Sequence, residues 1–261
     1  MLFTYESGDP TAPAIVFLHG AGLSGRMWQP LHLRLPDYYC LAPDLPEQGN
    51  SLHTGPFRLE DAAKQVVALI DEGVPGRRAH LVGLSLGADL VLAIMQIAPV
   101  AVDHVVVSAA APLGKALGKV VLALATSPLS FIYLEKQFNM SARMLGIPEA
   151  YRAMFCEDML LAVNPAFTRR SIEALMDLPQ LLPRASEAPT LVVVGSKENG
   201  LAKQGAKRVV ASLKHARGMV VPGVNHIWNL QAPDLFTDTV RAWIEDRPLP
   251  QTLQPLIKKG R

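Results

Sequence analysis

The chain has 261 residues, of which 25 are Lys or Arg and 23 are Asp or Glu, so its formal net charge is +2. This length suits one sizeable domain with a full core. The near-neutral charge excludes a broad electrostatic field for nucleic acid or anionic lipid, so we expect a small molecule as the partner and no nucleic acid.

Short apolar runs alternate with segments of helical periodicity along most of the chain. The apolar runs predict six strands, at Ala14–Leu18, Tyr39–Ala42, His80–Leu84, His104–Ser108, Thr190–Val194 and Gly218–Val221. The periodic segments predict helices at Leu59–Glu72, Leu86–Ile97, Leu201–Leu213 and Pro233–Asp246. Such an alternation is typical of an α/β fold with a mainly parallel sheet covered by helices on both faces.

The alternation stops between residues 112 and 189, where helical periodicity continues without a convincing strand. We therefore predict an α/β core at 1–111 and 190–247, a helical cap inserted at 112–189, and a poorly ordered tail at 248–261. The large apolar residues of the cap either line a substrate pocket or pack the cap onto the sheet. They are Phe131, Tyr133, Leu134, Phe138, Met140, Met144, Tyr151, Met154, Phe155, Met159 and Leu160.

Cysteine usage and apolar runs indicate the compartment. The two cysteines, Cys40 and Cys156, are too few for a disulfide scaffold and have no metal-ligand spacing. The first residues lack the basic and then apolar pattern of a secretory signal. The most apolar stretch, Ala116–Leu134, contains Lys119 and Pro128, so we expect no membrane span. A cytoplasmic location is therefore expected, and the oligomeric state stays open.

The strongest chemical signal is a G-x-S-x-G motif at Gly83–Gly87. It directly follows a predicted strand and precedes a predicted helix. A serine on such a sharp turn adopts a strained backbone, and glycines two residues to either side avoid clashes there. The motif predicts Ser85 as a nucleophile held above the edge of the sheet.

A second glycine-rich turn, His19–Gly22, follows the first predicted strand. Acyl transfer needs two backbone N–H donors aimed at the developing oxyanion, one after the nucleophile and one in this loop. We expect the N–H groups of Leu86 and Ala21 to form this oxyanion hole. His19 itself is expected to brace the loop.

A base and an acid are expected in the last two loops after strands. His226 follows the strand Gly218–Val221, and neutral imidazole is the general base best suited to pH 7. Glu198 lies after Thr190–Val194 and is the expected acid beside the imidazole. The remaining histidines, apart from His19, are expected to be structural: His32, His53, His80, His104 and His215.

Asp44 is an alternative acid by its chemistry. It precedes the proposed nucleophile, however, whereas the strand–elbow–helix arrangement orders its triad as Ser, then acid, then His. We therefore expect Asp44 to fix the loop Pro43–Ser51.

Five segments together resemble the α/β-hydrolase superfamily, in the branch of small cap-bearing serine esterases and related hydrolases. They are LHGAG (Leu18–Gly22), APDLPEQGNS (Ala42–Ser51), GLSLGA (Gly83–Ala88), VVVGSKE (Val192–Glu198) and GVNHIWNLQAPDLF (Gly223–Phe236). The resemblance implies a triad of Ser85, Glu198 and His226, with Ala21 and Leu86 as the oxyanion hole. Glu198 stands where the family usually has Asp, and Asp89 stands where it often has a small residue.

These residues predict hydrolysis of a small, largely apolar carboxylic ester through an acyl-enzyme, without a cofactor or a metal. A C–C bond hydrolase or a thioesterase would use the same triad, and the motifs exclude neither. A ligand-binding, receptor-like protein with little turnover is the alternative from another class.

Overall fold

The computed structural model describes residues 1–110, 115–126, 134–177, 182–183 and 186–257. Within these residues an eight-stranded sheet has the order β1-β3-β2-β4-β5-β6-β7-β8. Neighbouring strands are parallel except for β1 and β8, which pair antiparallel at the two edges. The strands are β1 (Thr4–Ser7), β2 (Ala14–Leu18), β3 (Tyr39–Pro43), β4 (Ala79–Leu84), β5 (Val102–Ser108), β6 (Thr190–Gly195), β7 (Ala216–Val221) and β8 (Gln254–Pro255).

Strand β2 shows why the central strands read as continuous apolar runs. All five of its residues are buried. Val16 and Leu18 belong to the hydrophobic cluster on one face of the sheet, whereas Ile15 and Phe17 belong to the cluster on the other face. Successive side chains of a strand point to opposite faces, so a strand covered on both sides needs apolar residues at every position.

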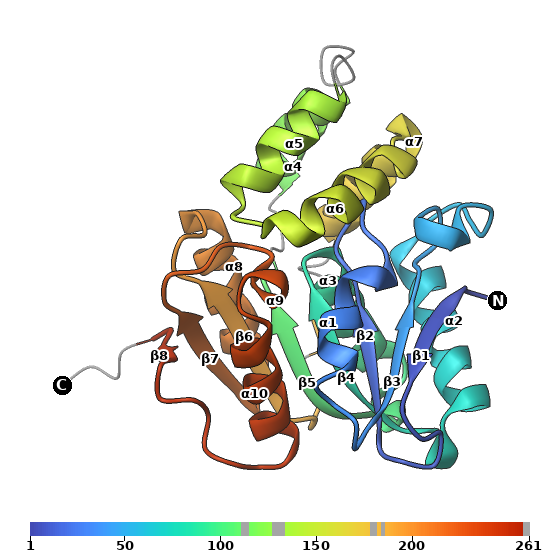
Figure 1. The fold of residues 1–261 in the computed structure, drawn as a ribbon, viewed down its shortest axis with the longest axis vertical. Coiled ribbons are helices and arrows are strands. Elements are labelled where there is room, and N and C mark those ends of the chain that lie inside the picture. Colours follow the sequence, from blue (N-terminus) through green and yellow to red (C-terminus); the bar gives the residue numbers. More distant parts are fainter. Residues whose placement is uncertain (111–114, 127–133, 178–181, 184–185, 258–261) are drawn as a thin grey trace.

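Helices cover both faces of this sheet (Figure 1). Residues of α2 (Leu59–Gly73), α3 (Leu86–Ile97) and α8 (Gly200–Ser212) join the first hydrophobic cluster. Residues of α1 (Gln29–His32), α9 (Trp228–Gln231) and α10 (Pro233–Ile244) join the second cluster. The six predicted strands and four predicted helices agree with the observed bounds to within two residues at each end. The predicted α/β architecture, a mainly parallel sheet covered by helices on both faces, is therefore confirmed.

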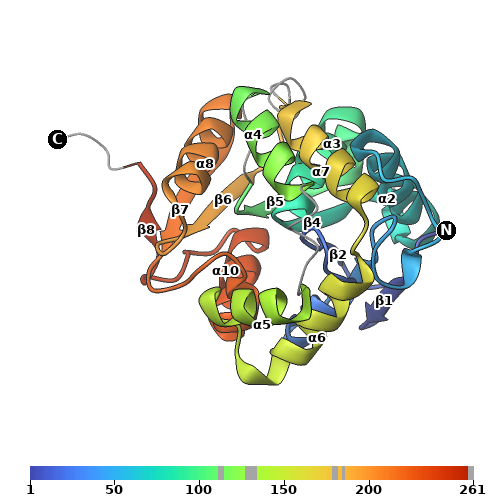
Figure 2. The same ribbon diagram turned by 90° about the horizontal axis from the view of Figure 1, so that it is seen from above.

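Among the described residues, four helices lie between β5 and β6, beyond the carboxyl ends of the parallel strands (Figure 1). They are α4 (Lys115–Ala125), α5 (Leu134–Met144), α6 (Glu149–Leu161) and α7 (Pro165–Asp177). Seen from above, α4 lies beside α7 and α5 beside α6 (Figure 2). We call α4 to α7 the helical insertion. Two of the predicted pocket candidates, Phe131 and Tyr133, lie outside the described residues. In the described part of the chain, no helix is both long and apolar enough to cross a bilayer.

The two edge strands and the C-terminal segment differ from the prediction. Neither β1 nor β8 was predicted, and the segment after residue 247 was expected to be a poorly ordered tail. Instead, β8 pairs with β7, and the side chains of Leu253 and Leu256 are buried. A two-residue strand in a Pro- and Gln-rich segment is too short to produce an alternating pattern. Residues 258–261 lie outside the described part.

His32 makes the fold sensitive to acid. Its ring is buried on α1 beside Phe17, with 5.5 Å between the ring centroids. Burial lowers the pKa of His32 to about 4. The unfolded chain therefore binds a proton between pH 6.5 and 4 that the folded chain does not, so stability falls as the pH falls through this window.

We expect His32→Leu to flatten this pH dependence. Between pH 7.5 and pH 4 the free energy of unfolding should drop by about 3 kcal/mol less than in the wild type. Urea unfolding at both pH values measures the difference. His53→Leu, which changes an exposed histidine, serves as the control. An unchanged pH dependence in His32→Leu would show that the imidazole binds protons equally in the folded and the unfolded chain.

Candidate active site

Ser85 occupies a strained turn between β4 and α3. Its backbone angles are φ 56° and ψ −120°, and a positive φ is uncommon for a residue other than glycine. The Ser85 N–H donates to the carbonyl of Ser108 at 2.9 Å, and the Ser85 carbonyl accepts from the N–H of Asp89 at 3.1 Å. The turn is thus fixed between the end of β5 and the first turn of α3.

The two glycines of the motif are required by close backbone contacts. A Cβ atom on Gly83 would lie 2.4 Å from the carbonyl oxygen of Gly87. A Cβ atom on Gly87 would lie 2.0 Å from the carbonyl oxygen of Leu18. Both distances are far shorter than a carbon–oxygen contact allows. The spacing of the motif therefore follows from how tightly β4, α3 and β2 approach one another around Ser85.

The loop after β2 passes beside the serine. A Cβ atom placed on Gly20 would lie 3.5 Å from the Cβ atom of Ser85. Among the described residues, the backbone N–H groups of Ala21 and Leu86 donate no hydrogen bond. The next N–H along the loop, that of Gly22, is already occupied by a glutamine side chain at 2.7 Å. The N–H groups of Ala21 and Leu86 are thus two free donors, one on each of the two segments that flank the serine.

His19 braces this loop, as expected. Its ring is fully buried, with Nδ1 2.9 Å from the carbonyl oxygen of Gly20. The other ring nitrogen, Nε2, accepts a hydrogen bond from the N–H of Leu45 at 2.9 Å. Burial lowers the pKa of His19 below its ordinary value. The neutral ring therefore connects the loop after β2 to the loop after β3.

His226 and Glu198 lie side by side. The Nδ1 atom of His226 is 2.7 Å from Oε2 of Glu198, and Oε1 of Glu198 accepts the N–H of Gly195 at 2.8 Å. The Glu198 side chain is 4% exposed and the His226 side chain 31%. Because a carboxylate only accepts hydrogen bonds, the imidazole proton sits on Nδ1. The lone pair of Nε2 is left free for another proton.

The loops after β6 and β7 meet at the carboxyl end of the sheet, which positions this pair. The N–H of Lys197 donates to the carbonyl of Val224 at 3.0 Å, and Oγ of Ser196 accepts from the N–H of Gly223 at 2.8 Å. A Cβ atom on Gly195 would lie 2.6 Å from the Val224 oxygen. The short β6 loop is therefore held against the β7 loop by its backbone.

The side chain of Ser85 stands apart from these contacts. In the described part of the chain its hydroxyl forms no hydrogen bond. Hydrogen bonds of reacting groups are often long or absent before substrate binds. The structure therefore brings together Glu198 with His226, and Ser85 with the loop that carries Ala21.

Asp44 has a different role, in agreement with the expectation. Its carboxylate is fully buried and accepts the N–H of Gly25 at 2.6 Å and the N–H of Asn50 at 2.7 Å. Both oxygens thus bind backbone groups of two loops. Within the described residues the imidazole of His226 pairs with Glu198 and not with Asp44.

Two residues that position this site were not singled out from the sequence. Gln48 is the side chain that holds the N–H of Gly22. Ser108 holds the elbow through its carbonyl, while its Oγ accepts the indole N–H of Trp228 at 2.8 Å. Gln48 lies within the matched segment Ala42–Ser51, which was the available signal. For Ser108, only its place at the end of a buried strand pointed to it.

Ion pairs between described residues hold the helical insertion on the core. Asp158 of α6 is 1% exposed, accepts the Oγ–H of Ser24 at 2.6 Å and pairs with Arg26. Arg170 of α7 pairs with Glu47 of the loop after β3, with 2.6 Å between nitrogen and oxygen. These contacts hold α6 against the segment after β2 and α7 against the loop after β3.

A cavity of about 290 Å³ lies between the loop after β2 and the helical insertion. Its lining is mainly apolar: Ala21, Gly22, Ala125, Leu134, Phe138, Met159, Ala162, Val163, Phe167, Thr168, Ser171 and Ile172. Two other cavities of about 460 Å³ each are lined by more charged side chains and include neither Ala21 nor Gly22.

Some of the apolar residues predicted to line a pocket do line this cavity, and others do not. Leu134, Phe138 and Met159 line the cavity. Met140 and Met144 are exposed instead, and Phe155 is buried in the core. Helical periodicity identifies a side of a helix, whereas the side that faces the cavity depends on how the four helices pack.

Comparisons with known proteins agree with this architecture. Residues 15–239 match the model of the alpha/beta hydrolase family. A protein of Gibberella zeae described as an AB hydrolase superfamily protein is 28% identical over 253 residues, which cover 94% of this chain and 85% of the relative. The pimeloyl-[acyl-carrier protein] methyl ester esterase of Pectobacterium atrosepticum is 35% identical over 99 residues, 38% of this chain and 37% of that protein. A solved structure of a hydrolase from Pseudomonas aeruginosa PA01 has a TM-score of 0.75 and 24% identity over 93% of each chain. The chain belongs to the alpha/beta hydrolase family.

Proposed function

We propose that the protein is a serine hydrolase that cleaves a small, largely apolar carboxylic ester through an acyl-enzyme. The 2.7 Å hydrogen bond between Glu198 Oε2 and His226 Nδ1 carries the proposal. It fixes the tautomer in which Nε2 accepts a proton, which is the form that a general base needs. The strained turn at Ser85 adds the nucleophile.

In the first half of the proposed reaction, Nε2 of His226 takes the proton of Ser85 as Oγ attacks the ester carbonyl. The negative charge that develops on the carbonyl oxygen is stabilised by the free N–H groups of Ala21 and Leu86. The imidazolium then donates its proton to the leaving alcohol, and the acyl group remains on Oγ.

In the second half, the same imidazole takes a proton from water as the water attacks the acyl group, and the imidazolium then returns that proton to Oγ of Ser85 as the acid leaves. Each half passes through an imidazolium at His226. The carboxylate of Glu198, which is nearly buried, stabilises that positive charge and holds the ring.

The cavity of about 290 Å³ supports an apolar acyl or alkyl group on the substrate. It begins at Ala21, which supplies one of the proposed donors, and its other walls are mainly hydrocarbon. An unpaired charge buried against such walls would be costly. A methyl ester esterase among the relatives also supports ester chemistry.

The proposal is tested with a fluorophosphonate label, peptide mapping and a substrate panel. We expect the label on Ser85 and repeated turnover of neutral activated esters, with anionic esters of equal size slower. Thioesters and substrates with a cleavable C–C bond belong in the same panel, because the same triad serves all three reactions. Tight ligand binding with a single turnover would instead favour the receptor-like alternative.

We expect Met159 to limit the acyl length. A Cβ atom on Gly22 would lie 2.7 Å from the Met159 sulfur, so this side chain lies against the loop after β2. Met159→Ala extends the cavity there, and kcat/KM for long acyl esters should rise about tenfold relative to short ones. The matched control is Met144→Ala on the neighbouring helix α5, where the side chain is 74% exposed. An unchanged ratio would place the acyl group elsewhere.

A further inference from the structure

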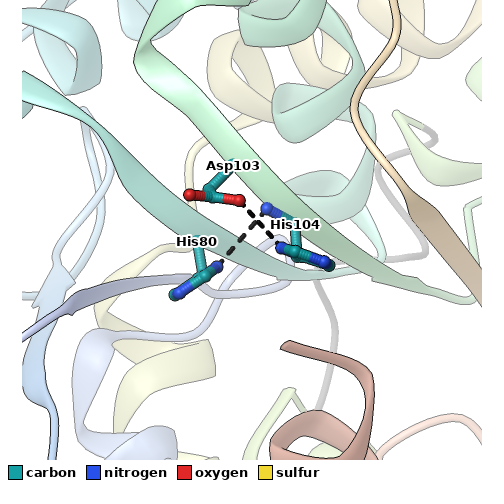
Figure 3. A group of neighbouring side chains, drawn as sticks. All are labelled: His80, Asp103 and His104. Atoms are coloured by element: carbon teal, nitrogen blue, oxygen red, sulfur yellow. Dashed lines mark hydrogen bonds and ion pairs between the residues drawn. The ribbon is translucent and has the colours of Figure 1, made fainter. Parts of the chain in front are cut away.

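Three side chains of types that can ligate a metal lie together near the starts of β4 and β5 (Figure 3). His80 is the second residue of β4, and Asp103 and His104 lie near the start of β5. One potential ligand atom from each lies within 4.8 Å of those of the other two. Ser85 follows the opposite end of β4, so this cluster plays no part in the proposed ester chemistry.

An irregularity in the sheet brings these side chains together. Ala79 pairs with Val102 and Leu81 pairs with Val105, so one residue of β4 faces two residues of β5. In a regular strand Asp103 and His104 would point to opposite faces. A bulge redirects side chains, and here both lie beside His80 (Figure 3). Short motif spacing gives no signal for this cluster, because His80 is far from the other two along the chain.

The Nδ1 lone pair of His80 accepts only a weak hydrogen bond. Its Nδ1 atom lies 3.4 Å from the backbone N–H of His104, which is longer than a good hydrogen bond.

The Asp103 and His104 ligands are already close to each other. Oδ1 of Asp103 lies 2.8 Å from Nδ1 of His104. Two ligand atoms about 2.1 Å from a metal lie about 3 Å apart at an octahedral angle and about 3.4 Å apart at a tetrahedral angle, and the observed separation is close to the first. A bound ion would replace the proton that His104 now shares with Asp103.

The surroundings resemble the outer shell of a metal site. The other ring nitrogen of His104, Nε2, faces Oδ1 of Asp246 at 3.4 Å, and a ligating histidine usually donates its second N–H to a carboxylate. The second oxygen of Asp103 faces Nε of Arg78 at 3.5 Å. Arg78 orients the carboxylate, while its positive charge limits the affinity for a dication.

We propose that His80, Asp103 and His104 bind a divalent transition-metal ion such as Zn²⁺, Co²⁺ or Ni²⁺. Two imidazoles and one carboxylate match the preferences of these ions, whereas Mg²⁺ and Ca²⁺ prefer oxygen ligands. Water would fill the remaining positions. The ion ties β4 to β5 at the bulge and stabilises the fold, and it takes no part in ester cleavage.

The test uses the full chain, freed of metal with a chelator and titrated with ZnCl₂ and NiCl₂ by calorimetry. We expect one ion per chain, a melting temperature that rises with the ion, and no competition from Mg²⁺. His80→Gln and His104→Gln should each weaken this binding at least about tenfold. Asp103→Asn provides a third variant, and the melting temperature of each without metal shows that it folds.

Two controls separate this site from other imidazole–carboxylate pairs. His215→Gln removes an exposed histidine that lies 2.8 Å from Glu187, and His226→Gln removes the one beside Glu198. Both should keep the high-affinity ion. Binding that is absent from the wild type, or equally strong in His80→Gln and His104→Gln, would overturn the proposal. Fluorophosphonate labelling of Ser85 should be the same in His80→Gln as in wild type, so the proposed function is tested separately.

Discussion

Ser85→Ala is expected to abolish fluorophosphonate labelling and to lower ester turnover by at least about 10⁴-fold. The elbow leaves the Ser85 hydroxyl without a hydrogen-bond partner among the described residues, so its removal breaks no structural contact. Alanine and serine have similar strain at φ 56°, and stability should change by less than about 1 kcal/mol. Intact mass after labelling, initial rates and urea unfolding measure the three effects.

Ser212→Ala is a suitable control for this experiment. Its hydroxyl lies on α8 and donates within the helix to the carbonyl of Val209. The control should keep both labelling and turnover. Labelling at another serine in the folded protein would refute the assignment of Ser85.

Glu198→Gln should reduce turnover by roughly 10² to 10⁴-fold. The two oxygens of Glu198 accept from two donors, Nδ1–H of His226 and the N–H of Gly195. A glutamine has one oxygen and one NH₂ group, so one donor must face another donor. Either the imidazole takes the wrong tautomer or the backbone contact of the β6 loop is lost. In both cases the charge that stabilises the imidazolium is gone.

Steady-state kinetics of Glu198→Gln, with Glu198→Asp beside it, measure this effect. The aspartate variant keeps the charge but is one methylene shorter, so its loss should be smaller if the loop can move. Asp44→Asn tests the alternative acid and should lower stability rather than kcat. If Glu198→Gln retained wild-type kcat while His226→Ala did not, the carboxylate partner of the imidazole would have to be assigned elsewhere.

The central strands and the elbow could be predicted because their causes are local. A strand buried on both faces needs an unbroken apolar run, and β2 and β6 have one. Gly83 is required by its close contact with the backbone of Gly87 within the same turn. The loop after β7 places His226 directly behind a recognisable strand, so its position also follows from the order of elements.

Other features depend on contacts between distant segments. The edge strand β8 has two residues and exists because β7 offers it a partner. The bulge beside His80 is a register shift between strands, which periodicity within one strand cannot reveal. The pairing of Arg170 with Glu47 joins residues 123 positions apart. Such contacts depend on tertiary packing, so the sequence pattern alone did not identify them.

In a chimera that carries the helical insertion of a relative, the loop equivalent to Pro43–Ser51 should come from that same relative. Glu47 in this loop receives Arg170 from α7, and its neighbour Gln48 holds Gly22. A graft without an arginine at position 170 would leave a carboxylate that is only 15% exposed without its partner cation. This unpaired carboxylate would lie next to Gln48, the glutamine that holds the loop beside Ser85. Recombination therefore separates coadapted residues when it treats the insertion as an independent module.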